Sequence, residues 1–425
     1  MKITNIKKSI VLSLHILPLG FGKFLLFSLF FSLCLSCSKE ERKSMEREDL
    51  FKLRYGFFED EINLTHFYER EESVDSQIFM KDGFFYISNS QAKKVMKFTS
   101  FGDILGLYYN AEFNENAISH EASHISENTD EKGKKDEVIH TVLSAKYPFN
   151  CPTFITVSDE KDLYVVDRLE ERDLEVDYED EIFLKNIVLH FNEKGEFVDY
   201  IGQEGYGGSP FPQIFKITSN AENELIVACR VREDFHLYYY DAKGVLKDKC
   251  IIEASNLKKL YKNDENIYIN IESAYPAYND AKVYIKCDYY LQEIDESTKV
   301  RKGISIEKSM LYVLNRTNKD ITSFELPTYN FTETVGGERV SVAKIYEMIG
   351  TDSDGKIFLI TPHKTGYSLI FFDVETKRFY QHTLYVPPAL YTSFSVGEGG
   401  ILSALFATEE DVLISWWKSS LGMQR

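Results

Sequence analysis

The residues best suited to chemistry in this sequence are two histidines and a glutamate, in the order His120-Glu121-Ala122-Ser123-His124. On a helix, two histidines four residues apart can share a zinc ion while the glutamate activates its bound water. The flanking residues are Asn, Ser, Glu, Asp and Lys, which do not build the buried helix that orients such ligands. We therefore interpret the motif as a loop sequence, with His120 and His124 as weak candidates for zinc.

A second candidate for a metal site is an acidic stretch of the sequence. Asp167–Glu181 contains nine carboxylates in fifteen residues, and alternating positions such as Asp173 and Asp177 could supply oxygen ligands to calcium. The stretch has no glycine for the sharp turn of a calcium loop, and its arginines offer ordinary ion pairs. We expect a solvated acidic insertion. No cofactor is predicted; calcium or zinc stays an alternative.

Other catalytic patterns are missing. Gly202–Gly208, GQEGYGG, lacks the Gly-Lys-Ser/Thr that cradles a phosphate, and GxSxG does not occur. We assign no catalytic residue, and a role other than an enzyme is favoured. The formal charge of −18 gives an acidic surface that repels phosphate backbones, so nucleic acid is not an expected partner.

The N-terminal 36 residues predict the cellular location of the protein. They carry four lysines and no acid, followed by an uncharged run of thirteen residues, Phe24–Ser36. Such a run is shorter than the roughly 20 residues of a membrane-spanning helix and fits a signal peptide. An uncleaved anchor is the alternative.

The end of this leader, Leu33-Cys-Leu-Ser-Cys37, resembles a bacterial lipoprotein signal, in the looser form known from spirochaetes because Cys34 stands where Leu is usual. The resemblance implies that Cys37 is acylated and anchors the protein to a membrane. Residues 37–49 are then the lipidated cysteine and a charged tether. Ser38 after the cysteine favours the outer membrane of the cell envelope. A redox CxxC is the weaker alternative, since no fold holds it there.

The stretch Ile214–Glu253 indicates the fold. Four short runs rich in Ile, Val, Phe and Tyr are separated by turn residues, which predicts a four-stranded antiparallel meander. One meander cannot bury both faces, so it should be one unit of a repeat. We predict an all-β chain with a β-propeller at residues 50–425.

The repeat is marked by second strands that follow polar turns. Six are found, within Lys81–Asn89, Asp159–Asp167, Asn220–Cys229, Ala281–Cys287, Asp352–Thr361 and Gly397–Leu405. Strands near Leu53–Phe58 and Val412–Trp417 should close the ring. We predict six blades, with seven as the alternative if Asn266–Ile271 is a second strand of its own. Insertions are expected at 111–146, as a mobile loop, and at 168–181 and 272–281.

Four cysteines follow the leader: Cys151, Cys229, Cys250 and Cys287. They have no metal-ligand spacing, and we favour buried free thiols over one or two disulfides.

The turn-apolar-Tyr/Phe-apolar-Asp/Asn pattern at Asp82–Asn89 and Asp162–Asp167 resembles NHL and TolB-like propellers. Lys94–Phe98, Tyr147–Asn150 and Tyr200–Pro212 resemble, more narrowly, uncharacterised spirochaete lipoproteins with NHL-like repeats, over about residues 74–417. The resemblance implies a six-bladed propeller in an anchored location and transfers no catalytic residue.

These observations favour a lipid-anchored, extracytoplasmic propeller that serves as a binding or scaffold module in the cell envelope. Its loop aromatics Tyr206, Phe211, Tyr275 and Tyr278 are expected contact residues, and an envelope protein or a glycan is the expected partner. One alternative is an envelope hydrolase or lyase with a metal or carboxylate site on the propeller. Another is a purely structural envelope protein.

Overall fold

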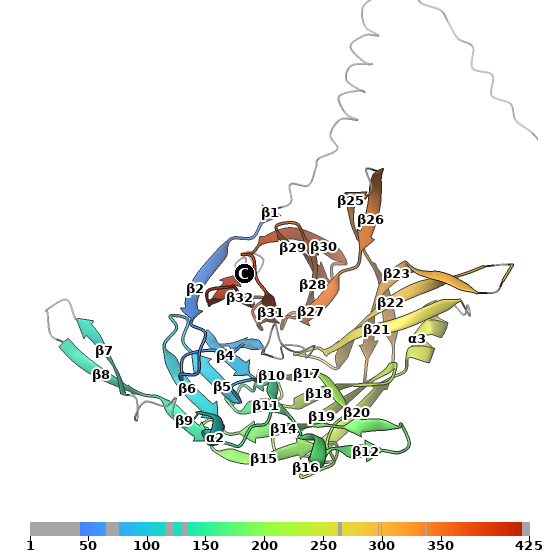
Figure 1. The fold of residues 1–425 in the computed structure, drawn as a ribbon. Coiled ribbons are helices and arrows are strands. Elements are labelled where there is room, and N and C mark those ends of the chain that lie inside the picture. The colour runs from blue at the N-terminus through green and yellow to red at the C-terminus, as the bar shows by residue number, and fades with distance from the viewer. Residues whose placement is uncertain are drawn as a thin grey trace, which may run out of the picture. The chain divides into compact units, whose positions relative to one another are not determined.

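The computed structural model describes residues 43–64, 76–114, 123–129, 135–261, 266–295, 297–298, 300–335 and 338–418. Lys43–Arg425 form one unit. Its described strands form six blade sheets around a central axis, so the predicted six-bladed β-propeller is confirmed (Figure 1). No described helix has the length and apolar character to cross a membrane.

Blades 1 to 3 follow one another along the chain. Blade 1 contains β3 (Ile78–Lys81), β4 (Phe84–Asn89), β5 (Lys94–Phe98), β6 (Ile104–Tyr109) and β9 (Leu143–Lys146). Blade 2 contains β10 (Pro152–Val157), β11 (Leu163–Arg168), β14 (Asn186–Phe191), β15 (Phe197–Gly202) and β16 (Gly205–Tyr206). Blade 3 contains β17 (Gln213–Ser219), β18 (Leu225–Val231), β19 (Asp234–Tyr240) and β20 (Leu246–Ile252).

Blades 4 to 6 complete the ring. Blade 4 contains β21 (Ile267–Pro276), β22 (Lys282–Ile294), β23 (Arg301–Asn315) and β24 (Ile321–Leu326). Blade 5 contains β27 (Glu347–Thr351), β28 (Lys356–His363), β29 (Gly366–Asp373), β30 (Arg378–Tyr385) and β1 (Lys43–Ser44). Blade 6 contains β31 (Tyr391–Val396), β32 (Leu402–Ala407), β33 (Val412–Trp417) and β2 (Arg47–Leu53).

Blade 3 is the meander that the sequence predicts. Its strands pair in chain order, and the turns between them contain residues that tolerate a positive φ, such as Asn223 at 57° and Gly244 at 68°. A side chain at position 244 would place its Cβ 2.6 Å from the ring of Tyr206, so this turn needs glycine for space as well as for backbone conformation.

The ring closes where the N-terminal strand β2 pairs antiparallel with the C-terminal strand β33. Closure was predicted, but its strand runs from Arg47 to Leu53 and not through Leu53–Phe58, where Phe57 and Phe58 are exposed. The charged residues of β2 have partners on blade 6. Glu48 accepts a hydrogen bond from Trp416 at 2.7 Å, and Asp49 accepts one from Ser415 at 2.7 Å. The predicted tether therefore overlaps strands from Lys43 onward.

The insertions differ from their prediction. The interval 111–146 contains α2 (Ala111–Asn114), the hairpin of β7 (Ser123–Thr129) and β8 (Lys135–Thr141), and β9, so it is not simply a loop. The interval 168–181 contains the short η2 (Glu171–Asp173) and β12 (Glu175–Asp177), which pairs with β13 (Ile182–Leu184). The first half of the interval 272–281 is strand, because β21 continues to Pro276, and the second half is the turn to β22.

Because β21 is the first strand of blade 4, Asn266–Ile271 does not begin a seventh blade. A third hairpin, β25 (Tyr329–Val335) with β26 (Glu338–Lys344), stands between blades 4 and 5, and α3 (Ala254–Tyr261) connects blades 3 and 4 (Figure 1).

The apolar core lies between blades. Each of six clusters of buried side chains combines residues from two adjacent blades, and together the clusters occupy all six blade interfaces. Blades 3 and 4, for example, share a cluster that includes Leu237, Ile252, Ile271 and Ile285. Each sheet therefore buries both faces only in the closed ring, as the repeat argument requires.

Candidate functional site

The first strands of the blades, β3, β10, β17, β21, β27 and β31, surround the propeller axis (Figure 1). Near the start of these strands lies a cavity of about 350 Å³, to which all six blades contribute lining residues. Four of the six strands have a β-bulge at this level, in β10, β17, β21 and β27. A bulge re-aims the side chains beside it, and bulges are frequent next to binding sites.

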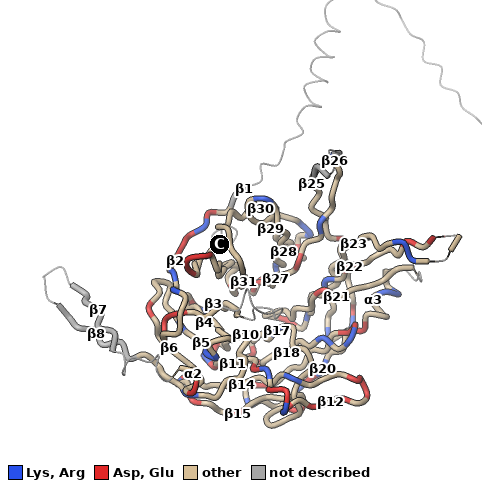
Figure 2. The backbone as a smooth tube through the Cα atoms, viewed as in Figure 1, with Lys and Arg blue, Asp and Glu red and all other residues tan. Residues whose placement is uncertain are grey.

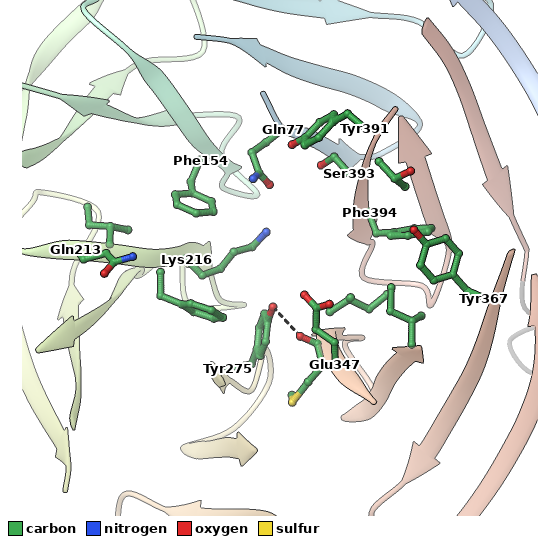
Figure 3. Close-up of a pocket in the computed structure, with 16 residues that line it drawn as sticks. Gln77, Phe154, Gln213, Lys216, Tyr275, Glu347, Tyr367, Tyr391, Ser393 and Phe394 are labelled. Atoms are coloured by element: carbon green, nitrogen blue, oxygen red, sulfur yellow. Dashed lines mark hydrogen bonds between the residues drawn. The ribbon is translucent and has the colours of Figure 1, made fainter. Parts of the chain in front are cut away.

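Lys216 of β17 points into this cavity (Figure 3). It follows the bulge at Phe215, which shifts the register between Ile214 and Lys216. Among the described residues no carboxylate oxygen lies within 4.0 Å of its Nζ, and its side chain makes no hydrogen bond there. Burial without a compensating charge lowers the pKa of Lys216 to about 8.

Glu347, the first residue of β27, faces the same cavity (Figure 3). Its side chain meets the water of the channel and has no ion pair within 4.0 Å in the described part of the chain. Burial nevertheless raises the pKa of Glu347 above its ordinary value, with Lys286 opposing the shift. An amine and a carboxylate thus face one cavity, and neither has an ion-pair partner in the part of the chain that the structure describes.

Aromatic rings form much of the remaining wall. Tyr275 stands edge-on to Phe215, with ring centroids 6.0 Å apart, and Tyr367 stands edge-on to Phe394 at 5.1 Å. The hydroxyl of Tyr275 donates a hydrogen bond to the carbonyl oxygen of Met348 at 3.3 Å, which fixes the ring beside Glu347.

The other end of the channel is closed by polar contacts between the turns that follow the first strands. The contacts run from each blade to the next around the whole ring, and the buried Lys81 bridges Asp159 and Glu398 of its two neighbours. The remaining pairs are Asp159 with Asn223, Ala221 with Tyr278, Asn279 with Ser353, and Ser353 with Glu398. Only about 80 Å³ of cavity remains at this end. Among the described residues, the channel is therefore accessible only from the Lys216 end.

A buried charge network lies in blade 4, behind the channel wall. Lys286 is fully buried and donates to both carboxylate oxygens of Asp288 at 2.8 Å. Glu272 lies 3.8 Å from Lys286 and accepts a hydrogen bond from Ser273 at 2.6 Å. Burial raises the pKa of Glu272 to about 7, although Lys286 and Ser273 oppose the shift.

The four predicted contact aromatics have different surroundings. Phe211 is fully buried between blades 2 and 3, which corrects the expectation that it is an exposed anchor. Tyr275 is 7% exposed and lines the channel cavity. Apolar loop residues of this ring fill blade interfaces instead. Tyr206 is half-buried and hydrogen-bonded to Nδ1 of His190 at 2.7 Å. Tyr278 is half-buried and donates to Asp159 at 2.8 Å in the closed end of the channel.

The metal candidates do not form a site within the described residues, where no group of three or more His, Cys, Asp or Glu side chains could hold an ion. His120 lies outside those residues, and His124 belongs to strand β7 rather than to a helix. Asp173 lies beside Arg172, and Asp177 accepts backbone N–H bonds from Glu179 and Asp180, in the acidic region around β12 (Figure 2).

Cys37 also lies outside the described residues. Of the four later cysteines, Cys229, Cys250 and Cys287 are buried free thiols, and Cys151 is half-buried. Burial raises the pKa of Cys229 and Cys287, which makes both thiols unreactive.

The sequence did not single out Lys216 or Glu347. The available signal at Lys216 was a lone charge inside an apolar first strand, Ile214-Phe-Lys-Ile217. Its meaning depends on which strand lines the axis, and this is a property of the closed ring. Glu347 begins a strand with no distinctive neighbours, so it gave no comparable signal.

No protein-family model and no curated protein matches this chain. Among solved structures, it is similar to a streptogramin B lyase, with a TM-score of 0.35 and 10% identity over 88% of this chain and 98% of that one. It is also similar to a polysaccharide lyase, with a TM-score of 0.40 and 9% identity over 88% and 99% of the two chains.

A third similar structure is the calcium-binding protein regucalcin from Agrobacterium tumefaciens, with a TM-score of 0.33 and 9% identity over 80% and 89%. These three structures differ in function, since two are lyases and one is a calcium-binding protein. Likenesses this weak give no argument about activity.

Proposed function

We propose that this protein is a binding module that takes a small polar ligand in the open mouth of its channel. The observation that carries the proposal is Lys216 inside a cavity of about 350 Å³, with no ion-pair partner among the described residues. A partly desolvated charge without a partner destabilises a fold, so its presence is best explained by a ligand that supplies the partner.

The geometry of the channel supports this function. The ring of contacts around Lys81 closes one end, so a ligand enters from the other end and is enclosed on all sides but one. The cavity volume falls within the range of about 300–1,000 Å³ common for small-molecule sites. The six blades surround the mouth, which makes the cavity a largely preformed site.

We propose further that the protein acts at the cell envelope, anchored by acyl chains on Cys37. The proposal is supported by the lysine-rich leader, the uncharged run Phe24–Ser36 and the resemblance to spirochaete lipoproteins. A Cys37→Ala variant should lose incorporation of labelled palmitate and keep its leader, because processing depends on the acylated cysteine. Unchanged incorporation of the label, or a wild-type protein that still carries residues 1–36, would contradict lipid anchoring at Cys37.

The ligand function is tested by screening small polar metabolites for stabilisation of the full-length protein against thermal unfolding. Ligands that bind the native state raise the midpoint temperature by mass action. We expect stabilisation of the wild type that is lost in Lys216→Met and retained in Lys247→Met, a variant of an exposed lysine in the same blade. If no compound stabilises the wild type, or if Lys216→Met responds equally, the channel is not the ligand site.

A further inference from the structure

Lys216 and Glu347 have no ion-pair partner among the described residues, unlike the fully buried charges of this fold. Lys286 pairs with Asp288, and Lys94 donates to the carbonyl oxygen of Phe58 at 2.5 Å. Asp167 accepts backbone N–H bonds from Asn150 and Cys151. The chain thus satisfies these charges internally, as buried polar groups require.

Lys216, which is half-buried, has no such partner within the described residues. Glu347 is more exposed, has no ion-pair partner there either, and faces the same cavity (Figure 3). They come from blades 3 and 5, on strands that blade 4 separates, and they have not moved together to form an ion pair within 4.0 Å. The space between them is held open by the rigid ring of blades rather than by their own contacts.

Opposite charges held apart restrict the ligand. A simple anion would be attracted by Lys216 and repelled by Glu347, and a simple cation would meet the reverse. A ligand with one carboxylate and one ammonium group satisfies both residues, and each pair forms charge-assisted hydrogen bonds. Because such a ligand is neutral overall, binding leaves the net charge of the cavity unchanged.

The other residues of the cavity wall determine which side chain the ligand can carry. Phe154, Phe215 and Phe394 give apolar surface, and the rings of Tyr275 and Tyr367 extend it. A ligand with an apolar side chain would bury that side chain here.

We infer that the channel mouth binds an amino-acid-like zwitterion, with its carboxylate on Lys216, its ammonium on Glu347 and an apolar side chain against the aromatic wall. This inference rests on the proposed function of the channel mouth as a ligand site. It adds the chemical class of the ligand and the orientation in which it binds.

The test uses isothermal titration of the full-length protein with two zwitterions of different length, L-leucine and glycyl-L-leucine. Each is compared with an analogue whose amine is acetylated and one whose carboxylate is an amide. At least one zwitterion should bind, and each capped analogue should bind roughly tenfold or more weakly, because it leaves one charge of the cavity without a partner.

Two variants assign the orientation. In Glu347→Gln, the difference between the zwitterion and its acetylated analogue should largely disappear. In Lys216→Met, the difference between the zwitterion and its amide should largely disappear. Lys247→Met should bind all the compounds like the wild type.

Equal binding of the acetylated analogue and the zwitterion would overturn the inference in favour of a plain carboxylate site, and equal binding of the amide would favour a cation site. Binding that neither variant changes, or no binding of either zwitterion, would also overturn it. The proposed function still stands if the metabolite screen finds another ligand class that depends on Lys216, and it falls only if that screen fails as well.

Discussion

Replacing Lys216 by methionine should make the protein more stable, although it removes the central group of the proposed site. Methionine fills a similar volume without a charge, and Phe154 and Phe215 offer it apolar contacts. The wild type keeps an unpaired ammonium in the channel, so the variant is relieved of its desolvation cost.

The size of the effect follows from the pKa. Burial lowers the pKa of Lys216 from 10.5 to about 8. At about 1.4 kcal/mol for each pKa unit, this shift corresponds to about 3–4 kcal/mol of destabilisation at neutral pH. Because the half-buried side chain still meets channel water, screening reduces this figure. We expect the free energy of unfolding to rise by about 1–3 kcal/mol in Lys216→Met at pH 7.

The stability gained by Lys216→Met should depend on pH. Between about pH 8 and 10.5 the unfolded chain keeps its proton on Lys216 and the folded chain has released it. The unfolded state then binds more protons, so the stability of the wild type rises with pH in this window. The advantage of Lys216→Met should be constant below about pH 8 and should vanish near pH 10.5.

Urea unfolding at pH 7 and pH 10.5, followed by the fluorescence of the two tryptophans, measures this difference. The matched control Lys247→Met removes a lysine whose side chain is 55% exposed and should change the free energy of unfolding by less than about 0.5 kcal/mol. A Lys216→Met variant that is less stable than the wild type at pH 7, or whose advantage does not depend on pH, would refute the reasoning.

Three further predictions concern buried charges. Asp288→Asn removes the carboxylate that pairs with the buried Lys286, and urea unfolding should show a free energy of unfolding lower by about 3–5 kcal/mol. The matched control Asp280→Asn changes a side chain that is 43% exposed and should lower it by less than about 1 kcal/mol. Similar losses in the two variants would contradict the role of burial. The pKa of Glu272 in the folded protein is raised to about 7, so the free energy of unfolding of the wild type should fall by up to about 3 kcal/mol as pH rises from about 4.5 to 7. Urea unfolding across that range should show that Glu272→Gln lacks this pH-dependent fall. An unchanged pH slope would show that Glu272 does not titrate there. Lys81→Met removes the bridge to Asp159 and Glu398 at the closed channel end and should lower the free energy of unfolding by about 1–3 kcal/mol. Hydrogen exchange of the backbone amides should become faster in the turns that Lys81 joins. Unchanged exchange would mean that the remaining contacts hold this end closed.

The sequence pattern was sufficient to predict the features that lie within a single blade. The apolar runs and turns of Ile214–Glu253 correspond to β17–β20, and the six predicted second strands fall on β4, β11, β18, β22, β28 and β32. These features depend on neighbouring residues, so periodicity and turn chemistry are enough to find them. The closing strand β2 was misplaced because its charged residues match partners on β33, at the opposite end of the chain.

Sequence alone therefore determined that the chain forms repeated antiparallel sheets, because each sheet is encoded within about one repeat. Only the tertiary structure decided which side chains meet. It buried Phe211 and Tyr275, placed Tyr278 at the closed channel end, and brought Lys216 and Glu347 to one cavity from blades that are not adjacent. The physical reason is ring closure: the channel is formed by six first strands, and no segment of the chain contains the information about what the other five present to it.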